Sequence, residues 1–323
     1  GRPGHFPRTA PRQIDEQYEA PLPQTCPACA GAVTETRVVT QHQEDLPPVR
    51  REDRRILGVR VSLFPKILAP IVVGVLALIV WHLIVVFFDM PHYVLPRPWL
   101  VIQTLFKDWG TLSPSLWVTL RITGLAFLCA AVGGLVISVL FTLSKWVEMS
   151  FFPYAVTLQV TPIVAIAPLI IIWAGNVFPD RGIDIALLIS AWIVAFFPIV
   201  SNTTLGLNST DHNLLNLFQL YGASRWQILW RLRLPNALPY FLGGLRISGG
   251  LALIGAVVAE FVSGTGGDES GLAYRILESG YRLNIPRMFA ALFMISLSGI
   301  LIFLVLTLLQ HLLLRKWHES AVK

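Results

Sequence analysis

Three charged side chains, Arg121, Arg246 and Glu260, interrupt long apolar stretches of the sequence. Inside a membrane such a charge costs about 2.5 to 3.5 kcal/mol, so each needs a polar partner or a route to water. Arg121 and Glu260 are therefore candidates either for a structural pair or for the lining of a path taken by an ionic solute. Arg246 lies near the end of its stretch, and we expect its long side chain to reach water.

The remaining chemistry-bearing residues form no catalytic or metal-binding set. His82 and His92 lack a second histidine or cysteine at ligand spacing, which favours core or surface histidines over metal ligands. Cys26 and Cys29 make half of a zinc motif, but no second pair follows, so no bound metal is predicted. Without a Gly-x-x-x-x-Gly-Lys-Ser/Thr loop, the chain is expected to bind no ATP and no cofactor of its own.

The composition places most of the chain in a lipid bilayer. Of the 323 residues, 54% are hydrophobic and 14% charged, and the mean hydropathy is +0.63. Residues 1–60 hold 9 of the 25 basic and 8 of the 19 acidic residues. Beyond residue 60 the basic residues are scattered around apolar runs, which argues against a nucleic-acid partner despite a pI near 9.5.

Six apolar segments are long enough to cross the bilayer as helices, which takes about 20 residues each. The first follows a long polar tail, so we expect an anchor and not a cleaved signal peptide. The fold class is all-α: a polytopic bundle of about six transmembrane helices within a domain over residues 60–320. The predicted spans are Ile67–Phe88, Leu116–Leu143, Phe151–Ala174, Ile183–Leu205, Leu242–Ser263 and Met288–Leu314.

Basic residues near the span ends predict the orientation. With the amino terminus in the cytoplasm, the inside segments hold 11 lysines and arginines and the outside loops hold six. Both termini and the segment between the fourth and fifth spans are then cytoplasmic.

Prolines mark possible irregularities within the spans. Pro162, Pro168 and Pro198 are each expected to kink or break a helix, and freed carbonyls are tolerated only where they face protein or a water-lined cavity. Together with Thr161, these residues are candidates for a translocation path; simple packing kinks are the alternative.

The cytoplasmic segment 216–240 has the pattern of a protruding helix pair. Residues 214–221 suit a helix, Gly222 permits a sharp turn, and Ser224 can cap a second short helix from Trp226 to Leu232 that ends before Pro235. Its mixture of aromatic, aliphatic and arginine side chains is typical of a surface that docks a soluble partner. An amphipathic helix lying against headgroups is the alternative.

This segment resembles the loop of binding-protein-dependent ABC importer permeases, whose motif reads Glu-Ala-Ala, three residues, Gly, nine residues, Ile, one residue, Leu-Pro. Gly222, Leu232, Leu234 and Pro235 stand at those offsets, whereas Asn216-Leu217-Phe218 replaces Glu-Ala-Ala. Further motifs resemble the nitrate, sulfonate and taurine branch. These are Leu95-Pro96-Arg97-Pro98, Thr161-Pro162, Ala167-Pro168-Leu169, Phe197-Pro198, Gly244-Leu245-Arg246, and Ala259-Glu260 before Gly271-Leu272.

The resemblance implies a multi-pass permease subunit of the bacterial inner membrane. Two permease subunits would pair, as a homodimer in the simplest case, and two cytoplasmic ATPases would supply ATP and Mg²⁺ chemistry. These would engage the loop through Asn216, Gly222, Ala223, Ser224, Arg225, Trp226, Leu232, Leu234 and Pro235. An extracytoplasmic binding protein would deliver a small, anionic solute such as nitrate, a sulfonate or bicarbonate; a neutral or cationic thiamine-pathway pyrimidine is the alternative.

Residues 1–55 have a different character from the rest. They are rich in Pro, Gln, Glu and Arg, which predicts a disordered tail. Gly1-Arg2-Pro3-Gly4, the Cys26–Cys29 pair and residues 43–49 resemble the amino-terminal zinc-binding region of insertion-sequence transposases, so a fusion or a mistaken start site is one interpretation. A membrane-anchored DNA-binding protein, or a membrane enzyme or sensor, is accordingly the competing class of function.

Overall fold

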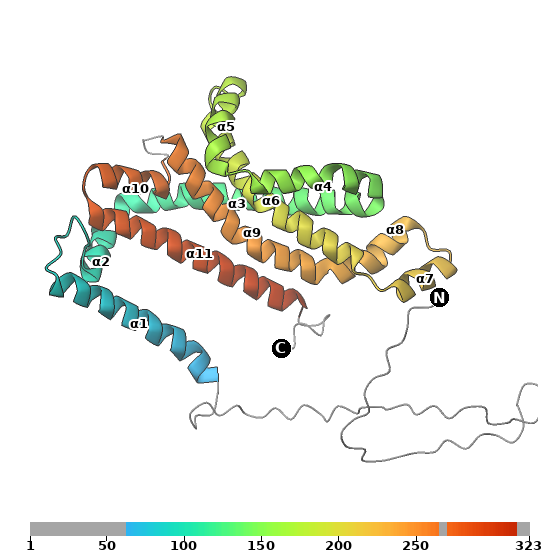
Figure 1. Ribbon diagram of the computed structural model, residues 1–323, viewed down its shortest axis with the longest axis horizontal. Coiled ribbons are helices and arrows are strands. Elements are labelled where there is room, and N and C mark those ends of the chain that lie inside the picture. The colour runs from blue at the N-terminus through green and yellow to red at the C-terminus, as the bar shows by residue number, and fades with distance from the viewer. Residues whose placement is uncertain (1–62, 265–269, 315–323) are drawn as a thin grey trace, which may run out of the picture. The chain divides into compact units, whose positions relative to one another are not determined.

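The computed structural model describes residues 63–264 and 270–314, and every regular element among them is a helix. The predicted tail, including Cys26 and Cys29, lies outside these residues. The chain divides into two units, Gly1–Val72 and Val73–Lys323, and the packing described below belongs to the second. The helices are α1 (Leu63–Phe87), α2 (Pro98–Lys107), α3 (Trp109–Leu143), α4 (Lys145–Val160), α5 (Ile163–Val177), α6 (Gly182–Asn208), α7 (His212–Leu220), α8 (Arg225–Ile228), the π-helical turn η1 (Leu229–Arg233), α9 (Leu234–Ser263), α10 (Leu272–Tyr281) and α11 (Ile285–Leu314) (Figure 1).

Five helical segments are long and apolar enough to cross a membrane, which confirms the all-α polytopic prediction. They are Leu68–Phe87, Trp109–Leu143, Gly182–Asn208, Arg225–Ser263 and Ile285–Leu314. The predicted span Phe151–Ala174 is instead two helices, α4 and α5, bent by 103°. The sharp turn between them is visible in Figure 1.

The bend falls at Thr161–Pro162, where the helix must stop. Proline disfavours helical backbone in the residue before it, and Thr161 has an extended ψ of 123°. The expected break occurs only there, because α5 runs on through Pro168 and α6 through Pro198 without interruption. Membrane helices accommodate interior prolines where neighbouring groups compensate for the lost backbone bond.

Helices α6 and α9 form the centre of the bundle and pack antiparallel through small residues. A Cβ placed on Gly255 would lie 2.9 Å from the Cα of Ala191, and one on Gly244 would lie 3.1 Å from the carbonyl oxygen of Pro198. At the other end of the pair, Gly206 faces the ring of Tyr240. Such close backbone approach is how helices associate inside lipid, where water provides no driving force.

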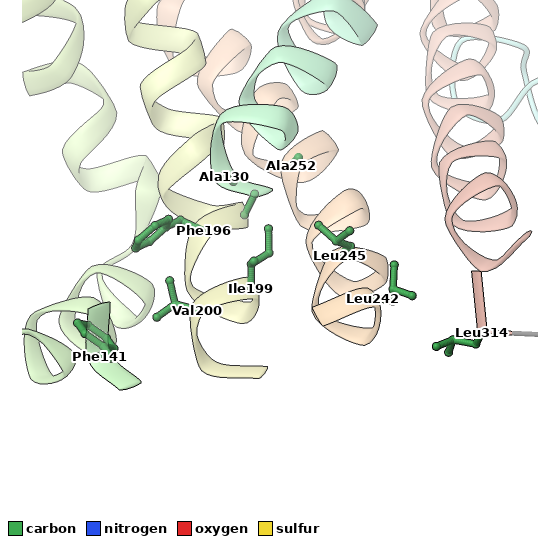
Figure 2. Close-up of a cluster of buried hydrophobic side chains, with 10 residues drawn as sticks. Ala130, Phe141, Phe196, Ile199, Val200, Leu242, Leu245, Ala252 and Leu314 are labelled. Atoms are coloured by element: carbon green, nitrogen blue, oxygen red, sulfur yellow. The ribbon is translucent and has the colours of Figure 1, made fainter. Parts of the chain in front are cut away.

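Helix α3 closes the other side of α6. Figure 2 shows Ile199 of α6 between Ala130 on α3 and Leu245 on α9, and Phe196 and Val200 on the side of α6 that lies away from Leu245. Ile199 and Val200 are fully buried. The three helices therefore share one core.

Candidate functional site: a glycine-hinged loop and a buried carboxylate

The loop between α6 and α9 begins with a capped helix and turns at a glycine. The Asp211 side chain accepts a hydrogen bond from the Asn213 N–H (2.8 Å) at the start of α7. Gly222 follows α7 with a φ of +69°, a left-handed conformation that costs a branched or bulky residue about 1 to 2 kcal/mol. The predicted sharp turn at this glycine is confirmed.

Ser224 caps the second helix of the loop, α8. The Gln227 N–H donates to Ser224 Oγ (3.3 Å), and the Ser224 N–H donates to Gln227 Oε1 (2.8 Å). These reciprocal bonds form a capping box, which satisfies backbone donors left free at the start of a helix. The predicted cap is confirmed, and it orients α8 relative to the glycine turn.

The second helix does not end before Pro235, contrary to the sequence prediction. It passes through the wide turn η1, where the Leu234 N–H donates to the carbonyl of Leu229, and continues directly into α9. Proline inside a regular helix clashes with the carbonyl four residues earlier, and a π-turn relieves this by shifting the bonding register. Pro235 then occupies the first turn of α9, a position where proline is favoured.

The loop has one anchored side and one exposed side. Leu229 is 2% exposed and packs with Leu207 and Ala237 at the base of α6 and α9. At the tip, Leu220 and Tyr221 are 86% and 84% exposed. Among the predicted loop residues, Asn216, Gly222, Ser224, Arg225 and Trp226 are exposed, whereas Ala223, Leu232, Leu234 and Pro235 are half-buried.

At the other end of α9, Glu260 is buried and hydrogen-bonded to protein groups. Its carboxylate accepts from the Thr119 hydroxyl (2.8 Å) and from the Ala273 N–H (3.1 Å), and only 2% of the residue is exposed. Thr119 Oγ1 in turn accepts from the Leu272 N–H (2.9 Å). One carboxylate thus ties α3 and α9 to the first turn of α10, where a negative charge is favoured by the helix dipole.

Further polar contacts join α10 and α11 to α3. The Arg275 side chain donates to Ser115 Oγ (2.9 Å) on α3 and pairs with Glu278 (3.0 Å). Arg287 of α11 pairs with Asp108 at the start of α3 (2.6 Å). Sequence reasoning missed Thr119 and Ser115, although the buried hydroxyls Ser115, Thr119 and Thr123 recur every four residues on one face of α3.

The two arginines of the spans are accommodated differently. Arg121 is exposed on α3, whereas Thr119, two residues earlier, is buried, so the anticipated Arg121–Glu260 pair does not form. The guanidinium carbon of Arg246 lies 4.2 Å from the centre of the Phe303 ring on α11. This cation–π contact holds Arg246 within the bundle.

The candidate path residues stand on several different helices. Thr161 and Pro162 mark the break between α4 and α5, and the Thr161 hydroxyl donates to the Thr157 carbonyl (2.7 Å). Pro168 is exposed, whereas Pro198 is buried between α6 and α9. No group of three or more metal-ligating side chains occurs within residues 63–264 and 270–314.

These features define a class: a multi-pass, all-helical membrane protein with a capped helix pair continuous with one of its spans. The family described as "Binding-protein-dependent transport system inner membrane component" matches residues 130–319, more than half of the chain. The chain therefore belongs to this family of ABC permeases, whose members are transport components rather than enzymes.

Individual proteins that are similar to this chain are also named as transport permeases. The formylaminopyrimidine transport permease protein ThiX of Halalkalibacterium halodurans is 32% identical over 255 residues, covering 78% of this chain and 97% of ThiX. The putative aliphatic sulfonates transport permease protein SsuC of Bacillus subtilis is 33% identical, covering 70% and 79%. A chain from inward facing conformations of the MetNI methionine ABC transporter shares the fold, with a TM-score of 0.54, 18% identity and coverage of 63% and 96%.

Replacing Gly271 with Ala should destabilise the bundle. Its backbone suits any residue, but an added Cβ would fall on the Glu260 carboxyl group and displace the start of α10. We expect a loss of about 1 to 3 kcal/mol, typical of overpacking. Thermal unfolding of the detergent-purified chain, followed by tryptophan fluorescence, measures it. Gly280→Ala, whose nearest neighbour would be Met288 Sδ at 3.9 Å, is the matched control, and equal stability of the two variants would contradict the assignment.

Proposed function

We propose that the chain is a permease subunit of an ABC importer and that the α7–α8 pair is the surface on which a cytoplasmic ATPase acts. The observation that carries the proposal is the continuity of α8, η1 and α9. A displacement of α8 reaches α9 without crossing a flexible joint, and α9 packs along α6 and α3. A movement of the α7–α8 pair would therefore move the membrane-spanning helix α9 as well.

The partners follow from this assignment. ATP and Mg²⁺ would be bound by the separate ATPase subunits, an extracytoplasmic binding protein would present the solute, and a second permease subunit would complete the path. The ATPase docks on the exposed tip formed by Leu220, Tyr221 and Trp226, because exposed aromatic and aliphatic side chains are the usual anchors of such contacts. Nucleotide state then biases two arrangements of the helices through differential binding.

We propose a small anion as the solute. The broken apolar segment supports this, since α5 starts at the break behind Pro162 with no side chain capping its first turn. Half-helix amino termini at such breaks attract anionic groups. The similarity to SsuC, which is named as a permease for aliphatic sulfonates, also favours an anionic solute. A thiamine-pathway pyrimidine is the second candidate, favoured by the similarity to ThiX over 78% of the chain.

Substitutions at Gly222 and Arg225 should uncouple ATP hydrolysis from transport while leaving the permease folded. Gly222→Leu places a bulky residue at φ +69°, where it strains the turn, although no atom would lie within 4 Å of its Cβ. Arg225→Glu puts a negative charge at the start of α8, which favours the helix while it reverses the charge of an exposed loop residue. Both variants should insert normally and lose most transport-coupled ATP hydrolysis in proteoliposomes.

Gly222→Asn and Arg225→Lys are the matched controls, because asparagine tolerates the left-handed conformation and lysine keeps the charge. Both should retain most of the coupled activity. Full coupled activity in Gly222→Leu and Arg225→Glu would count against the loop as the docking surface.

The loop should be accessible only from the cytoplasmic side. A single cysteine at Gln219 or Trp226, two exposed positions, is placed in a chain whose native cysteines are replaced by serine. An impermeant maleimide should label it in inside-out vesicles and leave it unlabelled in intact cells. Labelling from the outside would overturn the orientation and the proposed ATPase contact together.

The solute class is tested with the partner binding protein. We expect native mass spectrometry of the protein that docks on this permease to show a bound small anion, and unlabelled anions of that class to compete for uptake in proteoliposomes. A bound aminopyrimidine, with uptake insensitive to sulfonate, nitrate and bicarbonate, would select the second candidate.

A further inference from the structure

A recess of about 380 Å³ lies behind the loop, between the end of α3 and the α7–α8 pair. Thr142 and Leu143 come from the last turn of α3, and Lys145 is the first residue of α4. The loop supplies the opposite wall. Among the described residues the lining is Thr142, Leu143, Lys145, Leu215, Gln219, Arg225, Ile228, Leu229 and Arg233.

The charged residues that line the recess within the described part of the chain are all cationic. They are Lys145, Arg225 and Arg233, and no acidic side chain stands beside them in that lining. Lys145 is 73% exposed at its side chain and pairs with Glu148 (2.8 Å), which stands outside the lining. Arg233 Nε is buried and has no hydrogen-bond partner within the described part of the chain. Arg233 is also a lining residue, and its guanidinium carries further N–H donors besides Nε. An anion in the recess would offset the positive charge of the lining through charge-assisted hydrogen bonds.

The remaining lining is apolar, through Leu143, Leu215, Ile228 and Leu229. Cations beside an apolar wall match an amphiphile with a negatively charged head, whereas a free inorganic anion would gain nothing from the leucines. Basic pockets between membrane helices on the cytoplasmic side bind phospholipid headgroups in this way.

The depth of the recess also suits a headgroup. Thr119, bonded to Glu260, and Leu143, at the recess, are separated by 24 residues of the continuous helix α3. At 1.5 Å per residue this is about 36 Å, slightly more than the roughly 30 Å of a hydrocarbon core. The Glu260 network and the recess therefore fit opposite headgroup layers.

The recess and the docking surface use different sides of the same helices. Arg225, Ile228 and Leu229 of α8 and η1 face the recess. Trp226 and Trp230, which do not line it, are 60% and 66% exposed. A lipid in the recess would therefore support the helix pair from behind while its tip remained free for a partner.

We propose that this recess binds the phosphate-bearing headgroup of an anionic phospholipid of the inner leaflet. The side of the membrane rests on the orientation in the proposed function, whereas the binding itself does not. Lys145 and Arg233 provide the charge and Arg225 closes the site, so the lipid fixes the loop against the end of α3.

The experiment uses the full chain, purified in detergent without any ATPase and mixed with phosphatidylglycerol or phosphatidylcholine. Native mass spectrometry should show retained phosphatidylglycerol in preference to phosphatidylcholine. Lys145→Gln and Arg233→Gln should each weaken retention roughly fivefold, the value of about one basic charge near a lipid surface. The matched control is Arg231→Gln, an exposed arginine of η1 outside the lining, which should leave retention unchanged.

Folding of each variant is checked by thermal unfolding, and the largely exposed Lys145 provides a substitution that leaves the core untouched. Equal retention in wild type, Lys145→Gln and Arg233→Gln would overturn the proposal. Stabilisation by inorganic phosphate without any lipid preference would assign the recess to a free anion instead. If these variants retain lipid unchanged but bind the ATPase more weakly in a separate pull-down with the ATPase, the recess is assigned to an acidic side chain of that partner and the lipid proposal is overturned. Because retention is measured without the ATPase, a failure of the docking proposal leaves this result standing.

Discussion

The antiparallel contact between α6 and α9 is the interaction on which the rest of the structure depends. Lipid offers no hydrophobic gain for bringing helices together, so association requires backbones close enough for dense packing. Gly255 against Ala191 and Gly244 against Pro198 provide that closeness. Since α9 carries the loop at one end and Glu260 at the other, this single contact positions both features.

The π-turn η1 decides how the loop is attached to the bundle. A proline in this position would ordinarily end the preceding helix, leaving the loop as a separate element on a flexible joint. The wider turn accommodates Pro235 and keeps α8 in line with α9. This continuity is the observation on which the proposed coupling to a separate ATPase rests, because a displacement of α8 would then reach α9 directly.

The charged groups of the long helices are accommodated in three different ways. Glu260 receives hydrogen bonds from a hydroxyl and a backbone amide, and Arg246 lies over an aromatic ring. Arg121, by contrast, stands exposed on α3. Glu260 therefore has a structural role, because its hydrogen bonds join α9 to α3 and α10. The cations that line the recess behind the loop have no acidic residue beside them among the described lining residues, which is why we propose an external anion there.

Local features were determined by the sequence alone. The apolar segments, the turn at Gly222, the cap at Ser224 and the break at Pro162 depend on residues within one or two helical turns, so the local pattern contains the information. Tertiary structure decided the bend of 103° between α4 and α5, the continuation of α8 into α9, and the partner of Glu260, which is Thr119 at a separation of 141 residues. It also gathered Lys145, Arg225 and Arg233 around one recess. Those outcomes arise from packing between distant segments, where the space left by neighbouring helices selects among conformations that the local sequence leaves open.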